Sequence, residues 1–225
     1  MDFICLPAGD RGILVQFKNE ISEQVNEQII ALSSLLKEKQ IPGVEEWVPG
    51  YCSLMVYYDP LKTDYKKLVN ILSSLQVSNT CEMRREKRIH NIPVLYGGET
   101  GKDLSDVAKI NRLTEKEVIE IHSGKIYRVY MIGFAPGFPY LGGLDPRIHT
   151  PRLKSPRVKV EAGSVGIAGK QTGVYPIDTP GGWQLIGRTP ITLFHPEKEQ
   201  PSLLKTGDII RFTPISKSEY VNWEI

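Results

Sequence analysis

The sequence predicts an α+β protein made of two domains. Over residues 13–95 the spacing of the apolar residues changes in the order strand, helix, strand, strand, helix, strand, which is the ferredoxin-like pattern. Residues 133–187 then hold eleven of the 20 glycines and seven of the 16 prolines. That density excludes a long helix, because proline lacks an amide donor and glycine loses the most backbone entropy on folding. We therefore expect a ferredoxin-like domain over residues 1–95 and a barrel or sandwich of short strands over residues 96–225.

The elements of the first domain follow from residue spacing and capping residues. Alternating apolar residues predict a strand over residues 13–17. Ser22 is placed to cap a helix that runs to about residue 39, with apolar residues at 25, 29, 32 and 36 on one face. A hairpin is expected over residues 44–48 and 53–58, followed by a helix capped by Thr63 or Asp64. A strand over residues 88–95 would complete the pattern.

The second domain is expected to open with two short helices and then become a β-structure. The helices are predicted over residues 103–110 and 114–123, the second beginning with a capping box from Thr114 to Glu117. A strand over residues 127–134 leads into the segment rich in glycine and proline. Short apolar runs at residues 165–167, 185–186 and 191–194 indicate further strands within or just after it.

The composition is that of an ordinary soluble globular protein. Hydrophobic residues make up 40% and charged residues 24%, and the net charge of +2 gives no reason to expect a membrane or nucleic-acid partner. The cysteines Cys5, Cys52 and Cys81 are far apart and form no CxxC pair, so neither a zinc site nor a disulfide framework is predicted. The sequence shows no signal peptide and no membrane-spanning run. We expect a cytoplasmic protein with no metal site.

A basic cluster at residues 84–88 reads Arg-Arg-Glu-Lys-Arg. Such a cluster is compatible with nucleic-acid binding. A short charged run that contains a glutamate and enters a strand is more typical of an edge that discourages pairing between molecules. We therefore expect no nucleic-acid partner.

The segment 133–187 carries six cationic residues against three acidic ones. An excess of cations on turns suits a small anionic substrate, because arginine grips a carboxylate with two hydrogen bonds. Arg152 and Arg157 are the substrate-binding candidates, each beside a proline that stiffens its loop, and a surface role remains equally open. For Arg147, Lys154 and Lys159 the surface interpretation is favoured.

Polar and aromatic residues after position 170 complete the candidate site. Gln171, Thr172 and Tyr175 offer an amide, a hydroxyl and a phenol, which suit a ureido or lactam group, and we interpret residues 171–175 as a polar turn. Tyr175 is also a candidate catalytic residue. Trp183 follows two glycines and is either a wall of the substrate site or core filling, with core slightly favoured.

His122 is the other catalytic candidate. It lies near the end of a predicted helix, and histidine is the usual general acid or base near neutral pH. A buried histidine with a packing role is the commoner alternative. Phe134, Phe138 and Tyr140 stand among prolines and would either pack internally or form a docking surface for a partner protein.

Three motifs carry a family resemblance. Residues 133–141 read Gly-Phe-Ala-Pro-Gly-Phe-Pro-Tyr-Leu, residues 171–176 read Gln-Thr-Gly-Val-Tyr-Pro and residues 180–183 read Pro-Gly-Gly-Trp. Together they resemble the signature of the allophanate hydrolase subunit 1 family, which includes the B subunit of 5-oxoprolinase and KipI-type proteins. The likeness covers nearly the whole chain. It implies a ferredoxin-like first domain and a cyclophilin-like β-barrel as the second.

The resemblance also implies a function. It points to the B subunit of an ATP-dependent 5-oxoprolinase, which opens 5-oxo-L-proline to L-glutamate together with a companion C subunit and a LamB-like A subunit. No phosphate-binding motif appears in the chain, so ATP is expected in the assembled complex. Arg152 or Arg157 would hold the substrate carboxylate, while Gln171 and Tyr175 would orient the lactam.

Two alternatives remain open within the family. The chain would act on urea or allophanate, or it would inhibit a sporulation sensor histidine kinase as KipI-type members do. In the second case the surface from Phe134 to Tyr140 would dock on the kinase.

Overall fold

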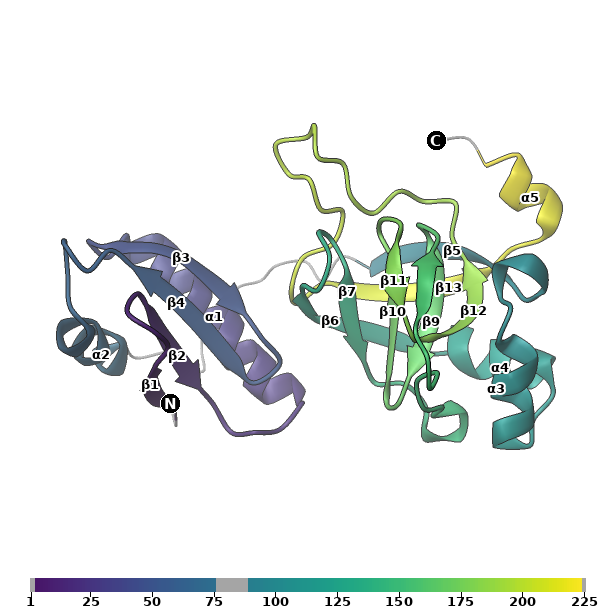
Figure 1. Ribbon diagram of the computed structural model, residues 1–225, viewed down its shortest axis with the longest axis horizontal. Helices are drawn as coiled ribbons and strands as arrows, with labels where there is room; N and C mark the ends of the chain where they lie inside the picture. Colours follow the sequence, from purple (N-terminus) through teal and green to yellow (C-terminus); the bar gives the residue numbers. More distant parts are fainter. Residues whose placement is uncertain (1–2, 76–88, 224–225) are drawn as a thin grey trace. The chain divides into compact units, whose positions relative to one another are not determined.

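The computed structural model describes residues 3–75 and 89–223, and the chain divides into two compact units, Met1–Glu86 and Lys87–Ile225 (Figure 1). Each unit has its own hydrophobic core. The basic cluster at residues 84–88 and Cys81 lie outside the described residues. Within the described part of the chain, every helix is too short or too polar to cross a membrane.

The first unit is a four-stranded antiparallel sheet with two helices. Its strand order is β1-β2-β4-β3. The predicted caps are confirmed, because the Ser22 hydroxyl accepts the N–H of Val25 and the Asp64 carboxylate accepts the N–H of Lys67. The sheet and helix side chains interdigitate in one buried cluster, which includes Ile13, Ile29 and Leu54. The elements are β1 (Ile4–Pro7), β2 (Gly12–Gln16), α1 (Glu23–Lys39), β3 (Val44–Pro49), β4 (Ser53–Tyr58) and α2 (Tyr65–Ser74).

The strand predicted over residues 88–95 is confirmed, but its place in the first unit, which the ferredoxin-like pattern required, is wrong. The strand at this place in the chain, β5 (Ile89–Tyr96), pairs with β12 and β13 of the second unit. The edge of the first sheet next to β2 is taken instead by β1, a strand that the sequence analysis missed. The physical reason is burial: Ile92 and Val94 of β5 are at most 1% exposed inside the core of the second unit.

The second unit is built on a closed seven-stranded barrel, which confirms the predicted barrel. Its strand order is β10-β7-β6-β13-β5-β12-β9, and only the β5–β13 pair is parallel. The two short strands β8 and β11 pair in a separate sheet. The strands not yet defined are β6 (Ile126–Ile132), β7 (Pro139–Gly142), β8 (Arg157–Val160), β9 (Ser164–Ala168), β10 (Gln171–Val174), β11 (Thr179–Gly181), β12 (Gln184–Arg188) and β13 (Ile209–Pro214).

Two sequence expectations change within the barrel. The residues interpreted as a polar turn, 171–174, form strand β10, which pairs with both β7 and β9. The apolar run at residues 191–194 forms no named strand and contributes one isolated bridge, from Phe194 to Ser202. Whether such a short run becomes a strand depends on the segment that pairs with it. The spacing of the residues within the run does not identify that segment.

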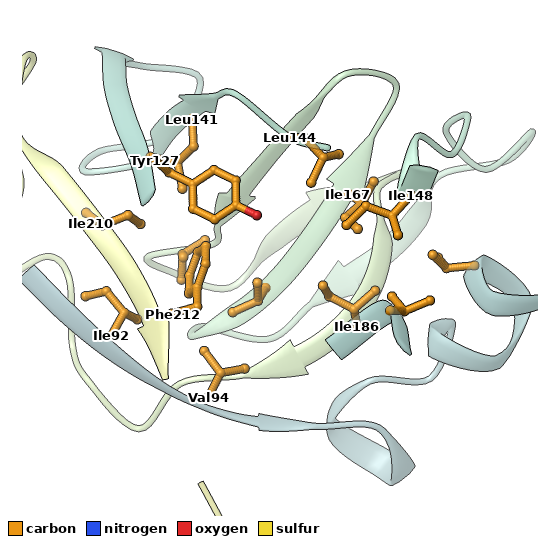
Figure 2. Close-up of a cluster of buried hydrophobic side chains, with 14 of the residues drawn as sticks. Ile92, Val94, Tyr127, Leu141, Leu144, Ile148, Ile167, Ile186, Ile210 and Phe212 are labelled. Carbon is orange, nitrogen blue, oxygen red and sulfur yellow. The ribbon is translucent and has the colours of Figure 1, made fainter. Parts of the chain in front are cut away.

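Apolar side chains fill the barrel. Tyr127, Phe212 and their neighbours converge between the strands, as Figure 2 shows. The helices α3 (Leu104–Asn111) and α4 (Glu115–Ser123) contact each other and lie side by side beside the barrel (Figure 1). The predicted capping box of α4, from Thr114 to Glu117, is confirmed. Short helices η1 (Gly98–Thr100), η2 (Pro146–Ile148) and α5 (Lys217–Val221) complete the unit.

Candidate functional site

Strand β10 separates the predicted site residues into two groups. Successive side chains of a strand point to opposite faces. Thr172 and Val174 face the barrel interior, where Val174 belongs to the core and Thr172 contacts His122. Gly173 faces the other way, toward a second cluster that contains Phe138, Tyr175 and Trp183. The predicted residues therefore do not form one site.

The outer group is an aromatic cluster made of Phe138, Tyr140, Tyr175 and Trp183. The Phe138 ring packs edge-on against Tyr175 at 5.2 Å and Trp183 at 5.4 Å between ring centroids, and it lies 4.9 Å from Tyr140. Edge-to-face contacts of this kind add to the stabilisation from area burial. Phe138, Tyr175 and Trp183 are at most 5% exposed, so their rings are chiefly part of the packing.

Glycines beneath the cluster make room for these rings. A Cβ on Gly173 would lie 3.1 Å from both Phe138 and Trp183, and one on Gly166 would lie 3.1 Å from Trp183. The space beside these two glycines is filled by protein side chains. Gly169 has a left-handed backbone, and a Cβ there would meet nothing within 4 Å.

Arg157 lies next to the cluster, but its guanidinium is bound within the protein. It donates to the Asp103 carboxylate at 2.5 Å and to the Trp183 carbonyl at 3.3 Å. The second Asp103 oxygen accepts the N–H of Leu185 at 2.6 Å. Asp103 is 6% exposed, so this carboxylate links α3, β8 and β12 from a buried position. Arg157 is thereby a positioning residue for the backbone around Trp183.

The structural role of Asp103 is not apparent from the sequence. It precedes α3 at the N-cap position, which an aspartate commonly occupies to cap a helix. Its side chain makes no cap hydrogen bond, because the carboxylate is turned toward Arg157 and Leu185. No local sequence signal distinguishes this use from an ordinary cap.

Arg152 has different surroundings from Arg157. It is exposed, and its guanidinium carbon lies 5.9 Å above the centre of the Trp183 ring, within the range of a cation–π contact. Burial raises the pKa of the Tyr140 and Tyr175 phenols, and the positive charge of Arg152 acts against both shifts. Arg152 therefore stands close to two neutral phenols and one indole.

His122 lies at the centre of a buried hydrogen-bond chain. Its Nδ1 is 2.7 Å from the Tyr96 hydroxyl and its Nε2 is 2.9 Å from the Thr172 hydroxyl. Thr172 donates its own proton to the carbonyl of Gly166, so Nε2 must donate to Thr172 and Nδ1 must accept from Tyr96. The ring is 0% exposed and stacks on Phe212 at 4.6 Å.

These surroundings keep His122 neutral. Burial lowers its pKa to about 3, because the charged imidazolium would lose its hydration. Thr172 and the inner face of β10 are held in place by the same bonds. A catalytic role for His122 stays a prediction. Its bond to Thr172, which in turn bonds to Gly166, is that of a residue that positions β10.

The predicted docking residues are divided between surface and interior. Phe134 is 64% exposed and has a left-handed backbone with φ of 69°, which is uncommon for a bulky residue. Its ring packs edge-on against Phe138 at 5.6 Å. Phe138 is buried and Tyr140 half-buried, so within this trio the surface is presented mainly by Phe134. Across the residues described, no three His, Cys, Asp or Glu side chains gather as metal ligands would.

Comparison with known proteins identifies the family. The family described as carboxyltransferase domain, subdomain C and D, matches residues 3–204. Proteins named as the B subunit of 5-oxoprolinase are similar over most of their length: that of Bacillus subtilis is 49% identical over 94% of this chain and 92% of its own, and that of Haemophilus influenzae is 44% identical over 92% and 95%. This chain belongs to the family of 5-oxoprolinase B subunits. The predicted family resemblance is thereby confirmed.

Solved structures of similar proteins share the fold. PH0987 from Pyrococcus horikoshii is 48% identical, with a TM-score of 0.59 over 96% of this chain and all of its own. TTHA0988 is 37% identical with a TM-score of 0.81, and this chain spans only 40% of it. The Kluyveromyces lactis urea amidolyase, 23% identical with a TM-score of 0.77 over 97% of this chain and 15% of its own, shares the fold.

Proposed function

We propose that this chain is the B subunit of an ATP-dependent 5-oxoprolinase, which converts 5-oxo-L-proline, ATP and water to L-glutamate, ADP and phosphate. The observation that carries the proposal is the identity of 41–49% to three proteins named as the B subunit of 5-oxoprolinase, each aligned over more than nine tenths of both chains. A protein named as a B subunit implies companion subunits. The companions we propose are a C subunit and a LamB-like A subunit.

The chemistry of the substrate explains the need for ATP. A five-membered lactam is stable to water, so its hydrolysis needs coupling, and phosphorylation of the amide oxygen would supply a better leaving group. We place the ATP site in the assembled complex. In this chain Gln171 and Tyr175 remain the residues proposed to orient the lactam. Thr172 supports them from the inner face of β10, where its hydroxyl bonds to His122 and Gly166.

The assembly dependence is directly testable. The purified chain alone is expected to show no ATP hydrolysis that depends on 5-oxo-L-proline, and to gain it when the companion subunits are added. Phosphate release, measured with and without 5-oxo-L-proline, gives the answer. Robust turnover by the isolated chain would refute the proposal that activity needs the companion subunits. If no combination of subunits turned over 5-oxo-L-proline, the 5-oxoprolinase assignment would be refuted.

A second candidate function is inhibition of a sporulation sensor histidine kinase, with Phe134 as the contact. The observation that favours it is the exposed ring on a left-handed backbone, since strained surface residues are frequently functional. Phe134→Ala should then weaken inhibition of kinase autophosphorylation without loss of stability. Phe138→Ala is unsuitable as a probe, because that ring is 1% exposed and its removal would leave a cavity.

The cyclophilin-like description of the barrel is also kept as a proposal. It is supported by the closed seven-stranded barrel. Superposition of the barrel strands, in their order, on a solved cyclophilin tests it.

A further inference from the structure

We propose that Arg152 and Trp183 form a preorganised carboxylate-binding site on the outer side of the barrel, in which the Arg152 guanidinium binds the carboxylate and the Trp183 ring is the platform that holds it. The inference rests on the proposed function and adds to it: the carboxylate is that of 5-oxo-L-proline, and Arg157 has no contact with it. Three independent observations support the site.

The residues on either side of Arg152 are hydrogen-bonded to the residues on either side of Trp183. The carbonyl of Pro151 accepts a hydrogen bond from the Gln184 side chain at 3.0 Å. The N–H of Leu153 donates to the carbonyl of Gly182 at 2.8 Å. Pro151 and Leu153, which flank Arg152, are thus hydrogen-bonded to Gln184 and Gly182, which flank Trp183. The backbone segments that carry the two side chains are therefore held together before a ligand binds, which lowers the entropy cost of binding.

The six cations of the segment 133–187 differ in whether an acidic side chain pairs with them. Arg147 pairs with Asp145, Arg157 with Asp103 and Lys159 with Asp178. Among the described residues no acidic side chain lies within ion-pair distance of Arg152, Lys154 or Lys170. Of these three cations, Arg152 is the one in cation–π contact with an aromatic ring. Within the described part of the chain, Arg152 therefore combines a charge without an acidic partner with a backbone that is anchored beside Trp183.

The chemistry of the pair selects the ligand class. The Arg152 guanidinium carbon lies 5.9 Å over the face of the indole, and the N–H groups of a guanidinium match the two oxygens of a carboxylate. The neutral phenols of Tyr140 and Tyr175 nearby add no negative charge that would repel an anion. A small monocarboxylate such as 5-oxo-L-proline fits this set of groups, whereas a neutral lactam without the carboxylate lacks the group that Arg152 binds.

The test compares 5-oxo-L-proline with 2-pyrrolidone, the same lactam ring without the carboxylate. In the assembled enzyme Arg152→Gln should raise KM for 5-oxo-L-proline by about 10-fold to 100-fold, the range for loss of a hydrogen bond to a charged group. Inhibition by 2-pyrrolidone should be unchanged. Arg152→Lys should recover part of the loss, because the charge is kept while the planar edge is not. Lys154→Gln is the matched control, since Lys154 is an exposed neighbouring cation.

Calorimetric titration of the chain alone measures binding of 5-oxo-L-proline without requiring catalytic turnover. The wild-type chain and Lys154→Gln should bind 5-oxo-L-proline with equal affinity, and Arg152→Gln should bind it about 10-fold or more weakly. Equal affinities for all three proteins, or no binding by the wild type, would overturn the site. An active assembled enzyme whose KM is insensitive to Arg152 would overturn the site and leave the 5-oxoprolinase assignment standing. If 5-oxo-L-proline binds in a way that depends on Arg152 but no assembly of subunits turns it over, the carboxylate site would stand and the 5-oxoprolinase assignment would fall.

Discussion

Arg152 and Arg157 carry the same guanidinium and each neighbours a proline, yet their surroundings assign them different roles. Arg157 is bound by Asp103 and the Trp183 carbonyl, whereas Arg152 is exposed and its guanidinium carbon lies 5.9 Å over the Trp183 ring. The local sequence left both arginines equally open as substrate ligands. Asp103, which binds Arg157, comes from a part of the chain far from either arginine.

For His122, too, the surroundings rather than the residue type determine the protonation state. Its burial predicts that the stability of the protein depends on pH. The folded-state pKa is about 3, against 6.5 for an unperturbed imidazole. Below pH 6.5 the unfolded chain binds a proton that the folded chain excludes, so stability falls as the pH falls from 6.5 toward 3. Between pH 7 and pH 5 this one residue should cost about 2 kcal/mol of the free energy of unfolding.

Urea unfolding at pH 7 and pH 5 measures the effect. In His122→Gln, which has no titrating ring, the difference between the two pH values should shrink by about 2 kcal/mol. NMR titration of the wild-type imidazole provides a check if the variant folds poorly. A His122 ring that titrates between pH 5 and pH 8 would contradict the buried neutral state and restore the residue as an acid–base candidate.

At the scale of elements, β10 connects the barrel core to the aromatic cluster. Its inner face carries Thr172 toward His122, and its outer face carries Gly173 beneath Phe138 and Trp183. A run of Gln, Thr, Gly and Val has no strong local preference for a strand, and the glycine favoured a turn. Pairing with β7 and β9 outweighed that preference. The capping box of α4 and the helical stripes, in contrast, are local, and α1, α3 and α4 were predicted nearly to their ends, whereas α5 was not predicted.

The fit of β10 under the aromatic rings predicts the effect of adding one methyl group. In Gly173→Ala the new Cβ would lie 2.8 Å from the Pro139 carbonyl oxygen and 3.1 Å from two rings, so we expect a loss of stability of about 1–3 kcal/mol. Gly182→Ala is the matched control, because its Cβ would meet its nearest neighbour at 3.6 Å and should change stability by no more than about 0.5 kcal/mol. Thermal and urea unfolding of the two variants compare them. Equal stability would show that the rings adjust to the added methyl group.

At the scale of the whole molecule, the position of β5 decides where one unit ends and the next begins. The residue spacing predicted a strand here correctly, but the unit to which it belongs depends on its partners. β5 pairs with β13 along its length and with β12 at its end, so the barrel does not close without it.

This assignment predicts the behaviour of fragments. A fragment of residues 87–225 should unfold cooperatively on heating, because it contains all seven strands of the barrel. A fragment of residues 97–225 should not, because it leaves β12 and β13 without their partner and removes Ile92 and Val94 from the core. Far-UV circular dichroism during heating distinguishes the two. A cooperative transition in the shorter fragment would show that β5 is dispensable for the barrel.

The sequence by itself determined the features that depend on neighbouring residues: the capped helices, the hairpin of β3 and β4, the replacement of helices by short strands after residue 133, and the family. Only the tertiary structure decided which strands pair, that β10 is a strand, that His122 is buried and neutral, and that Arg157 is bound while Arg152 is exposed. The physical reason is range. Caps and periodic stripes are contacts within one or two turns, whereas pairing, burial and charge compensation depend on residues that are distant in the chain and become neighbours only when it folds.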